Sequence, residues 1–333
     1  MKISKPRPTS VSVVIPNYNG KYLLESNLPS VYAALEYAQL KYEVIVIDDA
    51  STDDSLSFIQ QSYPEIKLLK NELNKGFSPT INKGIFAAQY ELVLALNSDV
   101  TLTNEYFIEQ LKYFETPNTF GVMGHIVDHN SPKIQDSGKF PSVSFNGIKT
   151  TYNYIPVIEV KDTWLPSFFL SGANALMDRD KLMQLKGFDE IYAPYYYEDA
   201  DLGIRAWRAG WCCYVESKSI CMHATSSTIS KAKPDKVKII AERNRIILNY
   251  LHLPNHLLRL FKYKLGLRCA FKMLSGNLIA YKAIQLFKKD LPSLKKSKQA
   301  LQQLQVKNNV NYSVVDVKEK IVEKLKEIKY RIF

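Results

Sequence analysis

The 333-residue sequence has no hydrophobic run long enough to cross a membrane, since none approaches the ~18–20 apolar residues that a spanning helix requires. Its first residues are basic, and the apolar run that follows them, Val11 to Ile15, is too short for the core of a signal peptide. We therefore predict a cytoplasmic protein that is not integral to a membrane.

Cysteine is also scarce, and its four occurrences are Cys212, Cys213, Cys221 and Cys269. Their spacing matches no zinc motif, because an adjacent pair is a poor chelate, so they are predicted to be buried thiols in a reducing compartment. The sequence lacks a GxGxxG fingerprint as well, which argues against a dinucleotide cofactor.

Positive charge is abundant but confined to the last third of the chain. Residues 1–230 contain 20 Lys and Arg against 26 Asp and Glu, whereas residues 231–333 contain 24 against 7. Such asymmetry predicts different partners for the two parts, and a basic part suits nucleic acid or an anionic membrane surface. No nucleic-acid recognition module is visible, so we expect no nucleic-acid partner. An amphipathic packing region with a solvated basic face is the other interpretation.

Short β-branched runs alternate with helix-length amphipathic stretches in the first hundred residues. The runs are 11–15, 43–47, 66–69 and 92–96, and the amphipathic stretches are 21–40, 53–62 and 78–89. This alternation predicts an α/β fold with a mostly parallel sheet, in which ligands bind beyond the carboxyl ends of the strands.

The rest of the chain gives a weaker pattern. The segment 116–170 is predicted to consist of loops and short strands. Helices at 179–186 and 198–209 and a strand at 212–216 should follow, and four helices are predicted after residue 231, at 236–251, 256–289, 293–306 and 316–331.

Polar loops follow three of the predicted strands, at 16–20, 48–55 and 96–100. A carboxylate at such a strand end accepts hydrogen bonds from a base or a ribose, a role that we assign to Asp49, whereas Asp53 suits a helix cap. The Asn-Ser-Asp sequence at 97–99 suits either a divalent cation, which prefers oxygen ligands, or an ordinary turn.

Residues 195–210 read YYYEDADLGIRAWRAG and place three acids within four positions. A helix start explains acids by the helix dipole, which contributes about 0.3–1 kcal/mol for each of them. It explains neither three acids so close together nor the three tyrosines before them. Aromatic rings beside carboxylates instead suit a sugar-binding wall.

Five stretches occur in one order: VSVVIPNYNG, VIDDASTDDS, NKGFSPTINKG, LALNSDV and GFDEIYAPYYYEDADLGIRAWRAGW. Together they resemble family 2 glycosyltransferases of the GT-A fold, most of all the bacterial rhamnosyltransferase-type enzymes of surface polysaccharide assembly. The resemblance covers roughly residues 10–250. It implies a GT-A catalytic domain at 1–230, with a nucleotide-sugar half at about 10–100 and an acceptor half at about 101–230, followed by a basic α-helical region at 231–333.

The resemblance also implies a role for individual residues. It assigns the nucleotide and donor sugar to Pro16, Asn17, Asn19, Asp49, Asn74, Gly76, Asn82, Asn97 and Ser98. It assigns the acceptor side to Ser171, Gly172, Tyr197 and Asp201, and a divalent cation, Mn²⁺ or Mg²⁺, to Asp99 and His223. The Ser and Thr residues at 225–228 suit phosphate contacts, and the Arg-Asn-Arg sequence at 243–245 is interpreted as structural or as a weak diphosphate contact.

The implied reaction is inverting, non-processive, metal-dependent transfer from a nucleotide-sugar to a hydroxyl of a glycan acceptor, which in this subgroup is commonly linked to a lipid. Asp199 is the implied base, and Glu198 beside it orients the acceptor or holds the loop. A lipid-linked acceptor favours peripheral contact of the basic helices with the inner face of the plasma membrane. The alternative is a nucleotide-sugar-binding protein or a nucleotidyltransferase of similar fold. A processive synthase is disfavoured, because no QxxRW motif is present.

Overall fold

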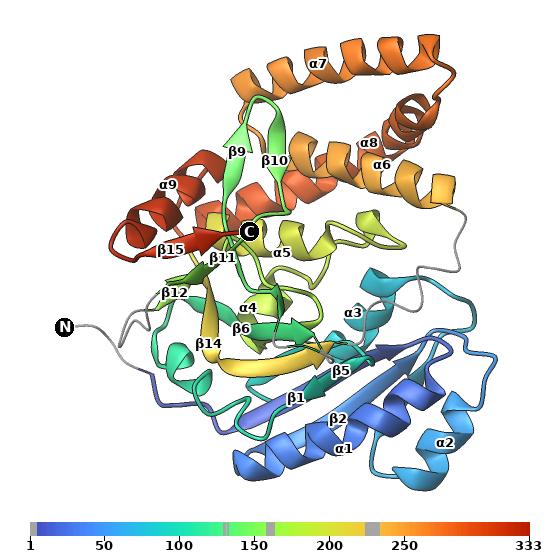
Figure 1. Ribbon diagram of the computed structural model, residues 1–333, viewed down its shortest axis with the longest axis vertical. Coiled ribbons are helices and arrows are strands. Elements are labelled where there is room, and N and C mark those ends of the chain that lie inside the picture. Colours follow the sequence, from blue (N-terminus) through green and yellow to red (C-terminus); the bar gives the residue numbers. More distant parts are fainter. Residues whose placement is uncertain (1–4, 129–130, 132, 158–163, 224–233) are drawn as a thin grey trace.

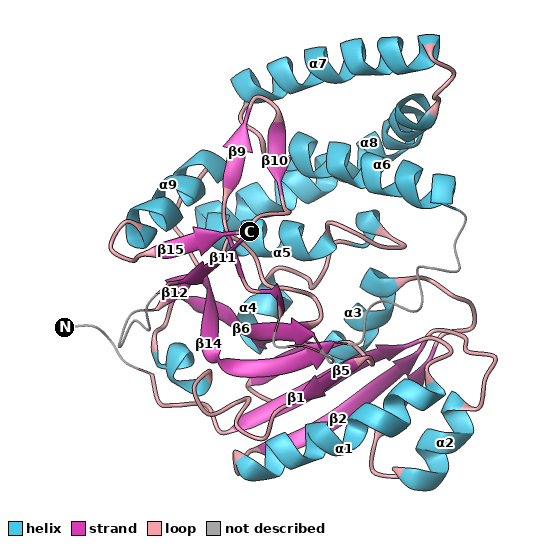
Figure 2. Ribbon diagram, in the orientation of Figure 1, coloured by secondary structure: helices cyan, strands magenta, loops and turns pink. Residues whose placement is uncertain are grey.

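A computed structural model describes residues 5–128, 131, 133–157, 164–223 and 234–333. Its centre is a twisted sheet in which four parallel strands form one half (Figures 1 and 2). These strands are β1 (Ser10–Asn17), β2 (Lys41–Asp48), β3 (Lys67–Lys70) and β4 (Leu92–Leu96), and they lie in the order β4-β1-β2-β3. The parallel sheet predicted from the alternating pattern is confirmed.

The helices α1 (Lys21–Tyr37), α2 (Ser55–Ser62) and α3 (Phe77–Ala87) connect these strands. In Figure 1, α1 and α2 lie together below the sheet and α3 lies on the other side of it. Helix α3 packs unusually close to the sheet at Gly84, where a Cβ atom would lie 2.3 Å from Val14 and 2.4 Å from Ile47. A larger residue at this position would push the helix, and the loop before it, away from the strand ends.

The other half of the sheet is mixed, and its central strand was not predicted. Strand β6 (Thr119–Asp128) is ten residues long and lies between β13 (Asn174–Asp178) and β14 (Cys212–His223). Two glycines obscured it in the sequence. They are needed because the neighbouring backbone is close: a Cβ at Gly121 would lie 2.6 Å from the Leu176 carbonyl oxygen, and one at Gly124 would lie 2.4 Å from that of Ser219.

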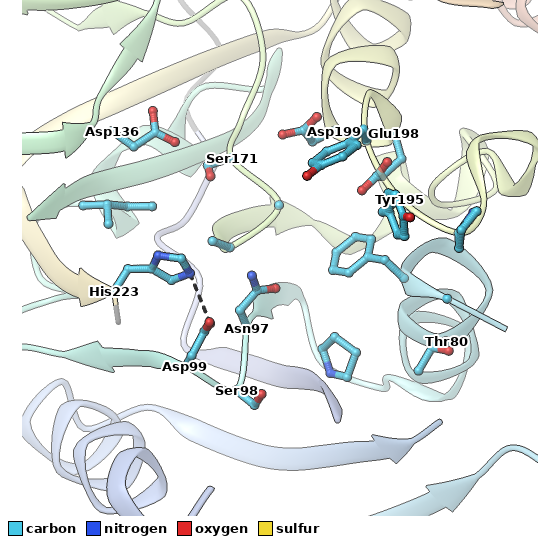
Figure 3. A pocket seen from close by; sticks show the side chains of 18 of the residues that line it. Thr80, Asn97, Ser98, Asp99, Asp136, Ser171, Tyr195, Glu198, Asp199 and His223 are labelled. Atoms are coloured by element: carbon cyan, nitrogen blue, oxygen red, sulfur yellow. Dashed lines mark ion pairs between the residues drawn. The ribbon is translucent and has the colours of Figure 1, made fainter. Parts of the chain in front are cut away.

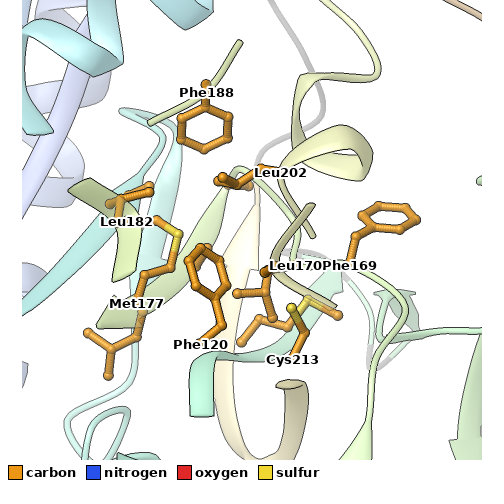
Figure 4. Close-up of a cluster of buried hydrophobic side chains, with 14 of the residues drawn as sticks. Phe120, Phe169, Leu170, Met177, Leu182, Phe188, Leu202 and Cys213 are labelled. Carbon is orange, nitrogen blue, oxygen red and sulfur yellow. The ribbon is translucent and has the colours of Figure 1, made fainter. Parts of the chain in front are cut away.

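Shorter elements complete this half. They are β5 (Val100–Leu102), η1 (Leu111–Glu115), β7 (Ile134–Asp136), β8 (Gly138–Lys139), β9 (Ser142–Ser144), β10 (Gly147–Lys149), β11 (Asn153–Pro156), β12 (Leu165–Pro166), α4 (Arg179–Gln184), η2 (Glu190–Tyr192) and α5 (Glu198–Arg208). Figure 4 shows the core that joins them, where Phe120, Met177, Leu182 and Leu202 meet from β6, β13, α4 and α5. This packing fixes the position of α5 over the sheet.

Four helices follow in the basic part: α6 (Pro234–His252), α7 (Asn255–Leu274), α8 (Ile279–Lys307) and α9 (Val314–Leu325). The predicted break near Pro292 is wrong, because this proline lies within α8 and the chain turns instead at 275–278, where Gly276 has φ +76°. The predicted last helix also ends early. Residues Tyr330–Ile332 form β15, which pairs with β11. In the described parts of the chain, no helix is both long and apolar enough to cross a membrane.

Candidate active site

A cavity of about 830 Å³ opens at the carboxyl ends of β1, β2 and β4. Figure 3 shows its interior, with the end of β4 on one side and the start of α5 on the other. Most of the predicted site residues line it, namely Pro16, Asn17, Asp49, Asn74, Gly76, Asn97, Ser98, Asp99, Ser171, Gly172, Glu198, Asp199 and His223. Asn19, Asn82, Tyr197 and Asp201 do not.

Asp49 lies at the end of β2 and holds the loop on the donor side. Its carboxylate accepts hydrogen bonds from Asn71 Nδ2 at 2.8 Å and from the backbone nitrogens of Lys75 at 3.0 Å and Gly76 at 2.9 Å. Gly76 has φ +84°, and a Cβ atom there would lie 2.6 Å from the backbone of Pro194. The loop is thereby fixed between the end of β2 and the tyrosine segment before α5, so it joins the two sides of the cavity.

Asn17 and Asn19 have different surroundings. Asn17 donates from Nδ2 to Asp48 at 3.1 Å, while its buried Oδ1 has no protein partner. A buried acceptor without a partner at a cavity wall is available to a ligand donor. Asn19 instead ties two loops together, since its Oδ1 accepts from Thr52 N at 2.7 Å and its backbone N donates to Ser51 Oγ at 2.8 Å.

Asp53 lies one residue before the N-cap residue of α2, which is Asp54, rather than at the predicted cap position, but it still binds the first turn of this helix. Its carboxylate accepts hydrogen bonds from the backbone nitrogens of Ser55 at 3.1 Å and Lys21 at 3.0 Å, so it joins the starts of α2 and α1. Asn82 likewise has structural partners, because its side chain donates to the Phe188 carbonyl at 2.8 Å and accepts from Phe188 N at 2.9 Å. It holds the loop after α4 against α3.

Asp99 and His223 meet across the strand pair β5–β14, with 3.2 Å between Asp99 Oδ1 and His223 Nε2 (Figure 3). The hydrogen bond with Asp99 raises the pKa of His223. Within the described ranges no group of three His, Cys, Asp or Glu side chains surrounds a possible metal. One carboxylate and one imidazole beside an open cavity nevertheless fit a Mn²⁺-type ion whose other ligands come from phosphate and water. Residues 225–228 lie outside the described residues.

The acid pair forms the opposite wall, at the start of α5. Burial, followed by the charge of Asp199, raises the pKa of Glu198 to about 8, and Glu198 Oε2 has no hydrogen-bond partner. Burial also raises the pKa of Asp199, while Lys139 and a hydrogen bond from Ala200 N act in the opposite direction. The pair therefore takes up and releases protons closer to neutral pH than ordinary carboxyl groups do, which suits a proton acceptor.

Lys139 is a cavity residue that no sequence motif indicated. It is 7% exposed, pairs with Asp136, and donates to Asn153 Oδ1 at 3.1 Å. Its charge acts on Asp199, which lines the same space beside the main cavity. The sequence offered only a single lysine in a segment interpreted as irregular, so nothing in the pattern distinguished it from a surface cation.

The tyrosine segment before the acid pair has an unusual backbone, with φ +79° at Tyr196 and φ +76° at Tyr197. Buried Asn244 of α6 holds it, because its Nδ2 lies 2.7, 2.9 and 3.0 Å from the carbonyl oxygens of Tyr192, Tyr195 and Tyr196. Non-glycine residues persist in this conformation only where their surroundings fix it. The basic C-terminal part thus helps to place the acid pair, as does Arg243, which donates to the Ala193 carbonyl at 3.1 Å.

Asp201 lies beneath the site and is 0% exposed. Its carboxylate accepts from Arg205 at 2.5 Å and Tyr192 Oη at 3.2 Å, and it lies 2.8 Å from His252 Nε2. These contacts leave its carboxylate no access to an acceptor sugar. The prediction that Asp201 lies on the acceptor side is therefore wrong, and its role is structural. Tyr197 lines a neighbouring space together with Asp199.

Comparisons with known proteins agree with this geometry. Residues 12–186 match the family model for glycosyl transferase family 2. An N-acetylglucosaminyl-diphospho-decaprenol L-rhamnosyltransferase of Mycobacterium tuberculosis is 26% identical over 245 residues, which cover 65% of this chain and 76% of that protein.

Solved structures show the same fold. A crystal structure of GalNAc-T7 with UDP, GalNAc and Mn²⁺ has a TM-score of 0.65 at 14% identity and covers 97% of this chain, which spans 58% of the length of that one. S. aureus TarS 1–349 in complex with UDP-GlcNAc has a TM-score of 0.52 at 17% identity, with 96% of this chain and 92% of that one covered. The GT-A fold expected from the motifs is confirmed, and the chain belongs to glycosyl transferase family 2.

Proposed function

We propose that the protein is an inverting, non-processive glycosyltransferase that moves a sugar from a nucleotide-sugar to a hydroxyl of a lipid-linked glycan, with help from a divalent cation. The observation that carries this proposal is the cavity with an acid pair, Glu198 and Asp199, on one wall and Asp99 with His223 on the other. The names of similar proteins support it, since they include a transferase acting on a diphospho-decaprenol glycan and structures with UDP, UDP-GlcNAc or Mn²⁺.

In this proposal the nucleotide lies over the ends of β1 and β2, near Asn17 and Asp49. Asp99 and His223 would hold the cation, which supplies positive charge to the leaving diphosphate. Asp199 takes the proton of the acceptor hydroxyl as its oxygen attacks the anomeric carbon from the side opposite the departing nucleotide. Attack from that side inverts the anomeric configuration. Glu198 keeps its proton near neutral pH and so does not add a second full negative charge beside the base.

The direct test is a thermal-shift panel of nucleotide-sugars with and without Mn²⁺. A ligand that binds only the folded state raises the melting temperature, and at 100 times its Kd it stabilises the fold by about 2.7 kcal/mol. We expect one nucleotide-sugar to stand out, and more strongly with Mn²⁺. No shift with any member of the panel would contradict the proposal.

The cation site makes a second prediction. Replacing His223 by alanine should weaken Mn²⁺ binding by at least about tenfold. Losing even a residue that only supports a metal ligand commonly lowers metal affinity by that factor. The measurement is the Mn²⁺ concentration that gives the half-maximal thermal shift with UDP. His256→Ala is the matched control because His256 is an exposed helix residue away from the cavity. If both variants required the same Mn²⁺ concentration for the half-maximal shift, His223 would not be a ligand of the cation.

The membrane contact that we propose has a defined surface. Helix α7, which lies at the edge of the molecule in Figure 1, carries an exposed apolar stripe of Leu260, Tyr263, Leu267, Phe271 and Leu274. These five residues recur three or four positions apart, which is helical spacing, and Arg and Lys residues flank them along the same helix. An apolar stripe with basic flanks suits the surface of an anionic bilayer.

This surface gives a third prediction. The double variant L267E/F271E should bind phosphatidylglycerol vesicles at least about tenfold more weakly, because each lost apolar contact costs about 1.5–3 kcal/mol when fully buried. Vesicle co-sedimentation measures the change. Val306→Glu is the control, since Val306 is 80% exposed but belongs to α8. If both variants sedimented with vesicles like the unmodified protein, the apolar stripe would not be the membrane-binding surface.

A further inference from the structure

A second, smaller cleft lies beside the active-site cavity, between α6, α7 and the start of α8. It has a volume of about 290 Å³ and is called here the basic cleft; its walls are Tyr197, Lys238, Ala241, Glu242, Arg245, Arg268, Lys272, Ile279 and Ala280. A space of about 340 Å³ adjoins it and shares Tyr197 and Ala241 in its wall. That space in turn shares Lys139, Tyr196 and Asp199 with the main cavity. The shared wall residues place the three spaces next to one another, with the basic cleft at one end and the proposed base at the other.

The basic cleft carries a surplus of positive charge. Four of its wall residues are Lys or Arg and one is acidic. Glu242 pairs with Arg245 at 2.8 Å and also with Arg268, so it holds the two guanidinium groups side by side without neutralising the cleft. Two adjacent guanidinium groups with nearby lysines match the oxygens of a phosphate or diphosphate.

Tyr197 separates the basic cleft from the acid pair. It lies in the wall of the cleft and also in the wall of the adjoining space that contains Asp199. Tyr197 therefore lies between the guanidinium groups of the cleft and the carboxyl groups of the acid pair. An extended ligand that passes Tyr197 would therefore have one end near the guanidinium groups and the other near the base.

The apolar stripe of α7 runs beside the residues that this helix contributes to the basic cleft. Arg268 and Lys272 belong to the cleft, while Leu267 and Phe271 are their immediate neighbours on the same helix and are 56% and 75% exposed. A cationic cleft next to an exposed apolar face matches a ligand that has phosphate groups and a hydrocarbon chain joined together.

We infer that the basic cleft binds the phosphate groups of the lipid-linked acceptor, so that the acceptor sugar passes Tyr197 and presents its hydroxyl to Asp199. This inference rests on the proposed function. It adds that the donor diphosphate and the acceptor phosphate have separate sites, the former at Asp99 and His223 and the latter between α6 and α7. The bilayer surface under α7 is then the side from which the acceptor enters.

The test measures binding of geranylgeranyl diphosphate by calorimetry, with UDP and Mn²⁺ present in excess to fill the donor side. The double variant R268A/K272A should bind this probe at least about tenfold more weakly, since it removes two positively charged hydrogen-bond donors from the proposed phosphate site. The charge-preserving variant R268K/K272R should retain most of the affinity. K288A/K289A, which removes two exposed lysines of α8 outside the cleft, should bind like the unmodified protein.

Three outcomes would overturn the inference. If R268A/K272A bound the probe as tightly as the unmodified protein, the basic cleft would not be the phosphate site. If K288A/K289A lost as much affinity as R268A/K272A, the effect would come from the overall charge of the protein. If inorganic pyrophosphate bound as tightly as the lipid diphosphate, the site would serve free phosphates. UDP affinity, measured alongside, separates these results from a failure of the proposed function, because the donor side should be unchanged in all variants.

Discussion

Replacing Asp199 by asparagine is expected to lower kcat by about 10²–10⁴-fold, the range that a positioned general base contributes. Asparagine keeps the size of the side chain and its hydrogen bond with Ala200 N but cannot take a proton. Donor binding should persist, since the contacts proposed for the nucleotide lie at β1 and β2 on the other side of the cavity. Release of UDP or another nucleotide in the presence of acceptor measures the rate, and calorimetry measures the donor affinity.

Glu198→Gln is the matched control for this experiment. Burial and the neighbouring Asp199 raise the pKa of Glu198 to about 8, so this side chain is mostly protonated at pH 7 and glutamine resembles it. We expect E198Q to keep kcat within several-fold of the unmodified protein. Near-full activity in D199N would show that another group is the base, and large losses in E198Q alone would reverse the two roles.

The pH dependence should reflect the same pair. A base works only when deprotonated, and burial raises the pKa of Asp199 above that of an ordinary aspartate. The rate should therefore fall on acidification at a higher pH than a solvent-exposed carboxylate would give.

The donor half of the site could be predicted from the sequence because it depends on local order along the chain. Parallel strands bring their carboxyl ends to one edge, so residues that directly follow apolar runs must meet there. The loops that contain Asn17, Asp49 and Asp99 were found in this way, and all three residues line one cavity. The contact of Asp53 with the start of α2 could also be predicted, because Ser55 is only two residues away in the chain.

Contacts between distant segments could not be predicted in the same way. Asn244 lies 48 residues beyond Tyr196, whose carbonyl it binds, and no periodic pattern marks such a contact. Lys139 acts on Asp199 only because β8 and α5 reach the same cavity. The glycines of β6 looked like loop residues, since the sequence does not show how near the next strand lies. Asp201 looked like a third acid of the site, whereas the helix period turns its side chain inward.

Asp201 makes the largest prediction for stability. Replacing it by asparagine should lower the free energy of unfolding by about 3 kcal/mol or more, because Arg205 would remain buried without its counter-ion. Arg205 also donates to the carbonyls of Leu185 and Gly187, so the change should loosen the segment that leads to the acid pair. Urea unfolding measures the loss. Asp180→Asn is the matched control, since the Asp180 side chain is 89% exposed.

The same carboxylate predicts how stability changes with acid. Burial alone would raise its pKa, but Arg205 and His252 outweigh burial and hold it at about 2. A carboxyl whose folded pKa lies below its unfolded value stabilises the fold above about pH 4 and loses that contribution as the pH falls toward 2. Burial lowers the pKa of His252, so acid favours its unfolded, protonated form as well. D201N should therefore lose less stability than the unmodified protein between pH 4 and 2, and parallel losses in the two proteins would show that the buried pair does not control the acid response.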